Sequence, residues 1–279
     1  MPSHSVDCVV TSPPYWALRD YGVLGQLGLE PTFFEYVTKL CDIFDEVRRV
    51  LKKRGTCFVN LSDTYAGSNK GAGYDGKNIA SWRFDKKPQL KASVKAKSLC
   101  MIPSRFAIEM CRRGWILRNE IVWHKPNAMP SSVKDRFTHD FEKVFFFTQL
   151  CKYNFQQLIE PYLTVEDRPP GVVRTRRYNY DSKFNNNPLA LNSPRARTLQ
   201  KEDPALGDFY HPKGRNMRAV WRIHTVPSAI EHHAMYPLAL CEIPIKAGSV
   251  ENGIVLDPFM GAGTTALAAL KLREVLPPT

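Results

Sequence analysis

The segment Thr-Ser-Pro-Pro-Tyr-Trp at residues 11–16 has the side chains and the rigidity needed to hold a flat ring that carries an amine. Two consecutive prolines fix two backbone φ angles and remove two N–H donors. The carbonyls of Ser12 and Pro13 can therefore point outward as rigid acceptors, and the Ser12 hydroxyl can join them in gripping an exocyclic amine. Tyr15 can stack on the ring. Taken alone, Ser-Pro-Pro is explained better by an ordinary turn.

A second candidate segment, residues 254–267, reads Ile-Val-Leu-Asp-Pro-Phe-Met-Gly-Ala-Gly-Thr-Thr-Ala-Leu. This pattern predicts a strand, a glycine turn and the start of a helix, and ligands bind at the carboxyl ends of strands in open α/β sheets. Gly261 and Gly263 let the backbone approach a ligand closely, and Thr264 can cap the helix. The segment lacks the Lys of a phosphate-binding loop and the third glycine of the dinucleotide fingerprint. Asp257 suits a positively charged amino group better than a pyrophosphate.

Together the two segments resemble the DNA methyltransferases that modify exocyclic amines, in the permuted order in which the catalytic motif precedes the cofactor motif. Ser-Pro-Pro-Tyr at residues 12–15 is most similar to the cytosine-N4/adenine-N6 members. The similarity extends over most of the chain outside two basic segments. It includes residues 16–22, 25–30, 123–127, 215–221 and 234–237.

The resemblance implies roles for particular residues. The target base would be held by Ser12, Pro13, Pro14 and Tyr15, in a pocket shaped by Trp123 and Lys125. The methionine end of S-adenosylmethionine would be lined by Asp257, Pro258, Phe259, Gly261, Gly263 and Thr264, with His233 and Pro237 in the other cofactor-side segment. Double-stranded DNA would be contacted by Arg174, Arg176, Arg177, Lys213, Arg215 and Arg218.

The implied reaction is direct in-line methyl transfer to a base flipped out of the duplex. An exocyclic amine is a poor nucleophile because its lone pair is delocalised into the ring, and acceptors at Ser12 and Pro13 would orient that lone pair. Ser-Pro-Pro-Tyr favours cytosine N4. Adenine N6 is the alternative, and a catalytically weak DNA-binding remnant is a further one. A cytosine-C5 enzyme needs a thiolate, usually after proline, and no Pro-Cys pair occurs.

Hydrophobic periodicity predicts the elements that position these residues. Strands are expected at 5–11, 56–61, 115–123, 143–148 and 254–257, and helices at 34–51, 102–113, 235–247 and 264–272. Alternating strands and helices predict an α/β fold with a largely parallel sheet, and the resemblance makes it Rossmann-like. The catalytic part would span residues 1–150, with a mobile basic loop at 66–97. A target-recognition region at 151–215 and a cofactor-binding part at 216–279 would follow.

The positive charge is concentrated in two segments. The chain has 39 Lys and Arg against 27 Asp and Glu, a formal net charge of +12. Residues 66–97 contain eight basic and two acidic side chains, and residues 168–218 contain eleven and four, so the remainder is nearly neutral. The second segment also contains aromatic side chains that can stack on bases. This layout favours nucleic acid as the partner, with solvated surface charge as the alternative.

Length and composition narrow the class of protein. The 279 residues suit one large domain or slightly more. No apolar run is long enough for a membrane span, and the first residues lack the features of a secretory signal. Seven scattered cysteines without a C-x-x-C pair argue against a disulfide framework or zinc site. We expect no metal and a reducing cytoplasm, in a bacterium or its virus.

The two ends of the chain depart from the family pattern. Family members continue into a further strand whose terminal acid holds the ribose hydroxyls, and residues 271–279 do not match that continuation. A Gly-Asp segment usually precedes the first strand, and only four residues precede Ser5 here. The sequence therefore predicts an incomplete adenosine pocket and weak binding of S-adenosylmethionine. A cognate restriction endonuclease would act separately.

Overall fold

The computed structural model describes residues 1–18, 25–66, 94–160, 215–226 and 236–275, and the chain divides into two compact units. One unit comprises residues 1–156 and 218–279, and the other comprises residues 157–217. In the described part of the second unit, β5 (Ile159–Glu160) pairs antiparallel with β6 (Arg215–Asn216). None of the helices in the described ranges has the length and apolar character required to cross a membrane.

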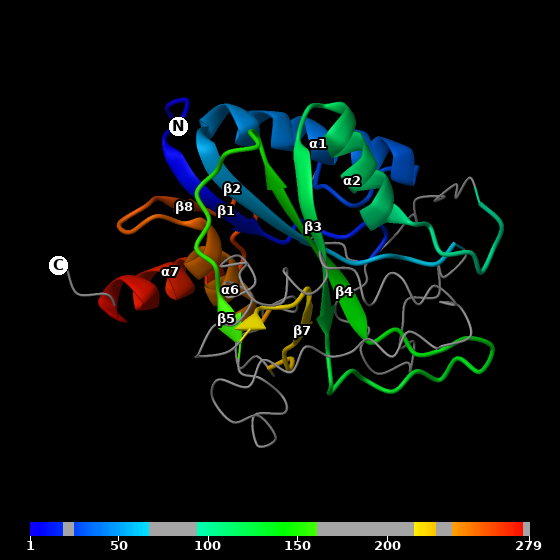
Figure 1. The fold of residues 1–279 in the computed structure, drawn as a ribbon. Helices are drawn as coiled ribbons and strands as arrows, with labels where there is room; N and C mark the ends of the chain where they lie inside the picture. The colour runs from blue at the N-terminus through cyan, green and yellow to red at the C-terminus, as the bar shows by residue number, and fades with distance from the viewer. Residues whose placement is uncertain (19–24, 67–93, 161–214, 227–235, 276–279) are drawn as a thin grey trace, which may run out of the picture. The chain divides into compact units, whose positions relative to one another are not determined.

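The first unit is built on a six-stranded sheet with the order β7-β3-β4-β2-β1-β8. Strand β4 pairs antiparallel with both of its neighbours, whereas every other pairing is parallel. Five strands therefore run in one direction and β4 runs against them, as Figure 1 shows. This confirms the predicted α/β architecture with a largely parallel sheet. The strands are β1 (Val6–Thr11), β2 (Leu51–Leu61), β3 (Ile116–His124), β4 (Phe141–Thr148), β7 (Val220–Arg222) and β8 (Val255–Leu256).

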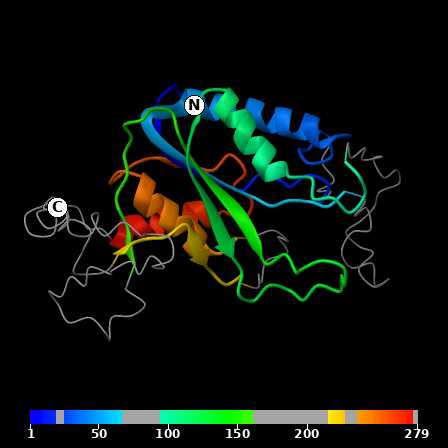
Figure 2. The same ribbon diagram turned by 45° about the vertical axis from the view of Figure 1, so that its right-hand side comes forward.

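Two pairs of helices cover the two faces of this sheet. Helices α1 (Phe33–Val50) and α2 (Ile102–Arg112) lie together on one face. Helices α6 (Leu238–Gly248) and α7 (Thr264–Val275) lie together on the other face. The rotated view in Figure 2 shows the same separation. Both faces of β1 and β2 are therefore covered, which explains why these strands are apolar along most of their length.

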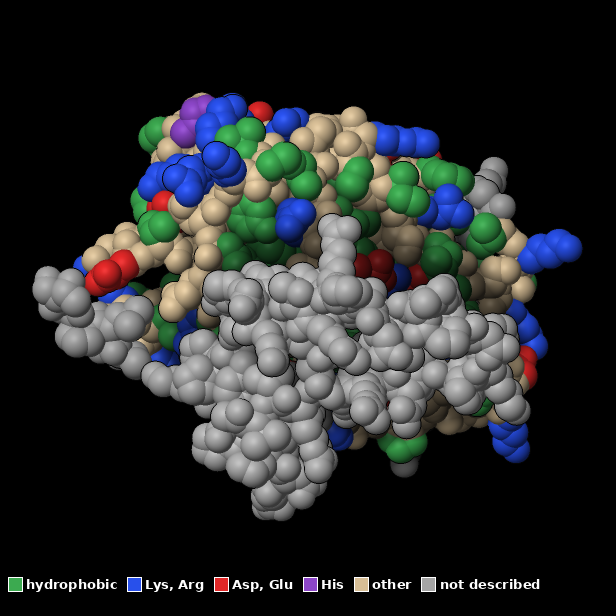
Figure 3. All heavy atoms as spheres, viewed as in Figure 1, with side chains coloured by type: hydrophobic (Ala, Val, Ile, Leu, Met, Phe, Trp, Pro, Cys, Tyr) green, Lys and Arg blue, Asp and Glu red, His purple; other side chains and the backbone are tan. Residues whose placement is uncertain are grey.

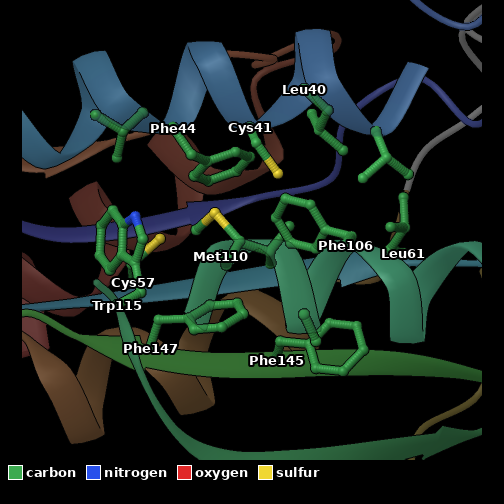
Figure 4. Close-up of a cluster of buried hydrophobic side chains, with 14 of the residues drawn as sticks. Leu40, Cys41, Phe44, Cys57, Leu61, Phe106, Met110, Trp115, Phe145 and Phe147 are labelled. Carbon is green, nitrogen blue, oxygen red and sulfur yellow. The ribbon is translucent and has the colours of Figure 1, made fainter. Parts of the chain in front are cut away.

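The main core lies between the first helix pair and the sheet. Thr32 caps α1 by accepting a hydrogen bond from the Glu35 backbone N–H at 3.2 Å, and the apolar stripe of the helix then faces inward. Figure 4 shows Phe44 of α1 and Phe106 of α2 packed above Phe145 and Phe147 of β4. The Phe44 and Phe106 rings are 5.3 Å apart in an edge-on arrangement. This core fixes the helices against the strands whose ends form the site.

The start of β2 and the presence of β7 differ from the sequence prediction. We expected the helix to end over residues 52–55 and the strand to begin at residue 56, but β2 begins at Leu51, directly after α1, because Leu51 pairs with Val6. Pairing with β1 thus outweighs the polar composition of these residues. Gly55 permits the close approach, since a Cβ there would lie 2.8 Å from the Asp7 carbonyl oxygen. Strand β7, which has three residues, was not predicted and is formed by pairing with β3.

The topology brings several polar segments to one edge of the sheet. The carboxyl ends of β1, β2, β3 and β8 lie at this edge, and the reversed strand β4 begins there. Side chains that follow β1 and β3 along the chain therefore meet a side chain at the start of β4. The residue that follows β8 contacts the end of β1 instead. This is the edge at which open α/β sheets bind their ligands.

Candidate active site

The Ser-Pro-Pro-Tyr segment leaves the carboxyl end of β1 and is held from two sides. The Tyr36 hydroxyl of α1 donates a hydrogen bond to the Pro14 carbonyl at 2.8 Å. On the other side, the Ala17 backbone N–H donates to the Gly28 carbonyl at 2.8 Å. Gly28 has φ +101°, and a Cβ there would lie 2.9 Å from the Tyr15 carbonyl oxygen. Glycine is therefore required at position 28 both for its backbone conformation and for this close contact.

Asp257, at the end of β8, is the centre of a buried hydrogen-bond cluster. Its side chain is 4% exposed in this fold. One carboxylate oxygen accepts from the Thr11 hydroxyl and from the Phe259 backbone N–H, the latter at 3.0 Å. The other accepts from the Tyr236 hydroxyl at 2.8 Å and from the Thr265 hydroxyl at 2.7 Å. A carboxylate has about four acceptor positions, and protein groups fill all of them.

The Asp257 cluster joins the two sequence motifs. Thr11 immediately precedes Ser12, and Thr265 lies in the first turn of α7, so one carboxylate ties the base-holding segment to the cofactor segment. Burial raises the pKa of Tyr236 well above its usual value, with smaller contributions from Cys241 and Asp257. Tyr236 therefore stays protonated and remains a donor. Sequence analysis did not single out this tyrosine, although it stands beside Pro237.

The loop after Asp257 presents its backbone to open space. Gly261 and Gly263 have φ +53° and +83°, in the left-handed region that favours glycine. A Cβ added at Gly263 would meet no atom within 4 Å. Pro258, Met260 and Gly261 are exposed, whereas Phe259 packs against the core. Helix α7 begins at Thr264 itself, so this residue is the first of the helix and not the residue before it. An exposed turn with two glycines allows a ligand to approach its backbone closely.

Glu142, at the start of β4, is a second, partly buried acid at this edge and was not predicted from the sequence. Its side chain is 11% exposed. It accepts hydrogen bonds from the Tyr15 hydroxyl at 2.6 Å and from the Asn60 amide at 2.9 Å, and it forms an ion pair with Lys125. These partners come from β2 and from the segments after β1 and β3. An acid two residues before the buried run of β4 was the available signal for it.

Trp123 and Lys125 lie beside this acid. The Lys125 ammonium lies 4.5 Å from the centre of the Trp123 ring. Trp123 is buried, and its indole N–H donates to the Ile223 carbonyl at 2.9 Å, which links β3 to the segment after β7. Lys125 therefore contacts both the Glu142 carboxylate and the Trp123 ring.

None of the cysteines resembles an activated nucleophile. Burial raises the pKa of Cys8 to about 12 and the pKa of Cys57 well above its usual value. The exposed cysteines, Cys111 and Cys151, lie at the end of α2 and after β4. Both positions are at the opposite edge of the sheet. Thiolate chemistry of the kind that cytosine-C5 methylation needs therefore has no support in the described site.

The structure brings together Ser12–Tyr15, the Asp257–Thr264 turn and Lys125, and their roles remain predictions. Pro237 is buried directly before α6. Arg218 is exposed. Outside the described residues lie His233, Arg174, Arg176, Arg177 and Lys213, and the structure describes only the backbone of Arg215. No three His, Cys, Asp or Glu side chains are placed to hold a metal ion within the described ranges. On the face drawn in Figure 3, Lys and Arg are dispersed among other side chains.

Comparison with known protein families gives the class to which the chain belongs. The family model for DNA methylases of the N6/N4 methyltransferase type matches residues 6–275. The chain belongs to this DNA methylase family.

Relatives and solved structures agree with this assignment. The chain is 36% identical over 267 residues to the Type II methyltransferase M.Cfr9I of Citrobacter freundii, covering 96% of this chain and 74% of the relative. It is 34% identical to the Type II methyltransferase M.SmaI of Serratia marcescens, covering 97% and 78%. Among solved structures, the cytosine-N4-specific PvuII DNA methyltransferase has a TM-score of 0.57 at 18% identity, covering 97% of this chain and 73% of that chain. A putative DNA modification methylase of Thermus thermophilus, complexed with S-adenosyl-L-methionine, has a TM-score of 0.51 at 20% identity, covering 98% and 79%. These two structures establish the likeness of fold.

Proposed function

We propose that this DNA methyltransferase transfers a methyl group from S-adenosylmethionine to N4 of a cytosine flipped out of a specific DNA sequence. The observation that carries the proposal is the hydrogen bond between Thr11 and Asp257. It fixes the base-holding segment next to the turn that would hold the methyl donor. Two reactants held in one geometry react far faster than two that must meet by diffusion, because the entropy of bringing them together has already been lost.

The cofactor would lie against the turn between β8 and α7. The open backbone of Gly261 and Gly263 allows close approach of its methionine end, and Phe259 supplies an apolar contact. Asp257 would act by fixing the shape of this turn, since protein donors fill its acceptor positions. When bound, S-adenosylmethionine supplies an electrophilic methyl group on a positively charged sulfur.

The Ser-Pro-Pro-Tyr segment would hold the base. Its Ser12 hydroxyl and the carbonyls of Ser12 and Pro13 would accept hydrogen bonds from the exocyclic amine and aim its lone pair at the methyl group. The Pro14 carbonyl is engaged by Tyr36 and would act only in shaping the segment. The Tyr15 ring would stack on the base. Position 12 is a serine, which is a neutral hydrogen-bond acceptor, whereas an acid there would be a charged acceptor. This serine is the feature that favours cytosine over adenine as the target base.

DNA recognition would fall to the two basic segments. Residues 66–97 and 168–218 carry the positive charge that phosphate contacts need, and phosphate contacts dominate DNA affinity. Residues 151–215 would read the target sequence. The Type II names of the relatives support a restriction-modification setting, with a cognate endonuclease acting separately.

Nucleoside analysis of DNA tests the proposal. The chain is expressed in cells without DNA methyltransferases of their own, and their DNA is digested to nucleosides and separated by mass. We expect N4-methyldeoxycytidine, absent from cells that lack the chain. N6-methyldeoxyadenosine instead would show an adenine-N6 enzyme. No modified nucleoside in cells that contain folded protein would contradict the proposal.

A further inference from the structure

A chain of hydrogen bonds leads from the Ser-Pro-Pro-Tyr segment to a partly buried carboxylate. The Ser12 hydroxyl donates to the Tyr15 hydroxyl at 3.2 Å, and the Tyr15 hydroxyl donates to Glu142 Oε2 at 2.6 Å. Both bonds point in the same direction, toward the acid. The last bond has the short length typical of an O–H donor facing a carboxylate. Its acceptor is a side-chain carboxyl oxygen of Glu142.

Methylation of an exocyclic amine produces a proton that must leave the site. The amine nitrogen gains a bond to carbon while both of its N–H bonds are still present, so it becomes positively charged until one proton departs. A serine hydroxyl is a weak base and cannot retain that proton at neutral pH. The Ser-Pro-Pro-Tyr segment therefore needs a stronger acceptor within reach of Ser12.

We propose that Ser12, Tyr15 and Glu142 form a proton relay that carries the amine proton to the Glu142 carboxylate. This inference rests on the proposed methyl transfer. The amine nitrogen forms the N–C bond as the methyl carbon–sulfur bond breaks, and the sulfur retains that electron pair as a neutral thioether. The amine then gives one proton to Ser12 Oγ, Ser12 gives its own proton to the Tyr15 oxygen, and Tyr15 gives its own to Glu142 Oε2. Glu142 ends as a neutral carboxylic acid.

The surroundings of Glu142 suit this task. Lys125 balances the charge of the carboxylate before transfer, and the Asn60 amide, at 2.9 Å, holds the accepting oxygen in place. The 11% exposure of the side chain gives a route by which the proton reaches water afterwards. Further ionisable groups near this edge are His139, Asp63 and Arg136, and His124, which lies 3.4 Å from Asp140. Burial raises the pKa of Tyr15 well above its usual value, so the tyrosine passes a proton on without remaining ionised.

Single-turnover methylation by three variants tests the relay. Glu142→Gln keeps the size of the side chain and an oxygen that accepts hydrogen bonds but removes the proton acceptor, and Tyr15→Phe keeps the ring but removes the hydroxyl. General acid–base catalysis contributes about 10²–10⁴-fold, so we expect each variant to be about 100-fold slower with unchanged DNA affinity. The double variant should be no slower than either single variant, because the members of one relay act as a unit. Glu120→Gln, which breaks an ion pair with Lys143 on the same pair of strands, is the matched control and should keep wild-type rates.

A second readout needs neither cofactor nor DNA. In the free protein, the Tyr15 hydroxyl proton should give a downfield NMR resonance that exchanges slowly with water, because it is partly buried and bonded to a carboxylate. It should be lost in Tyr15→Phe and shifted upfield in Glu142→Gln. A Glu142→Gln rate within threefold of wild type, additive effects in the double variant, or a resonance unchanged in Glu142→Gln would overturn the relay. Because these comparisons are made relative to an active wild type, a wild type without methylation would instead refute the proposed function.

Discussion

The Tyr15 carbonyl lies so close to Gly28 that no other residue fits at position 28 without moving it. A Cβ on Gly28 would come within 2.9 Å of that oxygen, closer than such atoms pack. Through this contact, residues 25–30 support the backbone of the Ser-Pro-Pro-Tyr segment. The positions of the Ser12 and Pro13 carbonyls therefore depend on a residue outside the motif.

Gly28→Ala should slow methylation by shifting the Ser-Pro-Pro-Tyr backbone. A small misplacement of reacting groups costs a large factor in rate, and we expect a loss of ~10-fold or more. Gly25→Ala is a matched control, since Gly25 also has a left-handed backbone, with φ +78°, but a Cβ there would meet nothing within 4 Å. Single-turnover rates of both variants decide the matter. Equal losses in the two would show that backbone strain alone, and not the contact with Tyr15, is responsible.

Ser12→Ala and Tyr15→Ala should abolish methylation and leave DNA binding largely intact. Both side chains would act on the flipped base, whereas phosphate contacts dominate affinity. A loss of at least ~100-fold in rate is expected, by analogy with removal of one positioned hydrogen-bond partner. Ser5→Ala, at the amino end of β1, is the control and should behave as wild type. Parallel loss of DNA binding and activity in Ser12→Ala and Tyr15→Ala would argue against these roles.

The stability of the fold should depend on pH through His139. Burial lowers the pKa of this side chain below 6.5, the influence of Asp63 and Glu142 being smaller and opposite. Between the pKa of His139 in the folded protein and 6.5, the unfolded chain binds more protons than the folded protein. The free energy of unfolding therefore rises with pH across that window and falls as the pH is lowered through it. Urea unfolding from about pH 5 to about pH 8 should show this slope, weakened in His139→Gln and kept in the exposed control His224→Gln. A slope unaffected by His139→Gln would assign it to other groups.

Alkylation of the native protein should modify two of the seven cysteines and leave methylation unchanged. Cys111 and Cys151 are exposed, whereas the other five are buried. Burial raises the pKa of Cys8, Cys41 and Cys241 to about 12, which keeps them as unreactive thiols. Peptide mass mapping after iodoacetamide treatment identifies the modified residues. Loss of activity in parallel with alkylation would point to a thiol in the reaction.

Most of the fold could be predicted because its signals are local. The apolar stripe of α1 and the buried runs of β1 and β4 identify these elements directly. The reversal of β4 and the existence of β7 could not be predicted in the same way. Both depend on pairing with β3. Strand β7 lies far from β3 along the chain, and a strand of three residues is too short to show hydrophobic periodicity.

The candidate site likewise contains residues that could be proposed from the sequence and residues that could not. Ser12–Tyr15 and Asp257–Thr264 are contiguous motifs with unusual residue types, so the sequence alone is enough to propose them as site residues. Glu142 and Tyr236 were missed because each acts through partners that are distant along the chain. The Tyr15–Glu142 bond joins residues 127 positions apart, and only the sheet topology brings them together.

Transfer of an isotopically labelled methyl group tests the central claim most directly. The purified protein is incubated with S-adenosylmethionine carrying a deuterated methyl group and with duplex DNA from cells that lack modification, and the nucleosides are analysed by mass. We predict that the label appears on N4 of deoxycytidine and is absent when Ser12→Ala replaces the wild type. Label on C5 of deoxycytidine, or no label in DNA that the folded protein binds, would contradict the account.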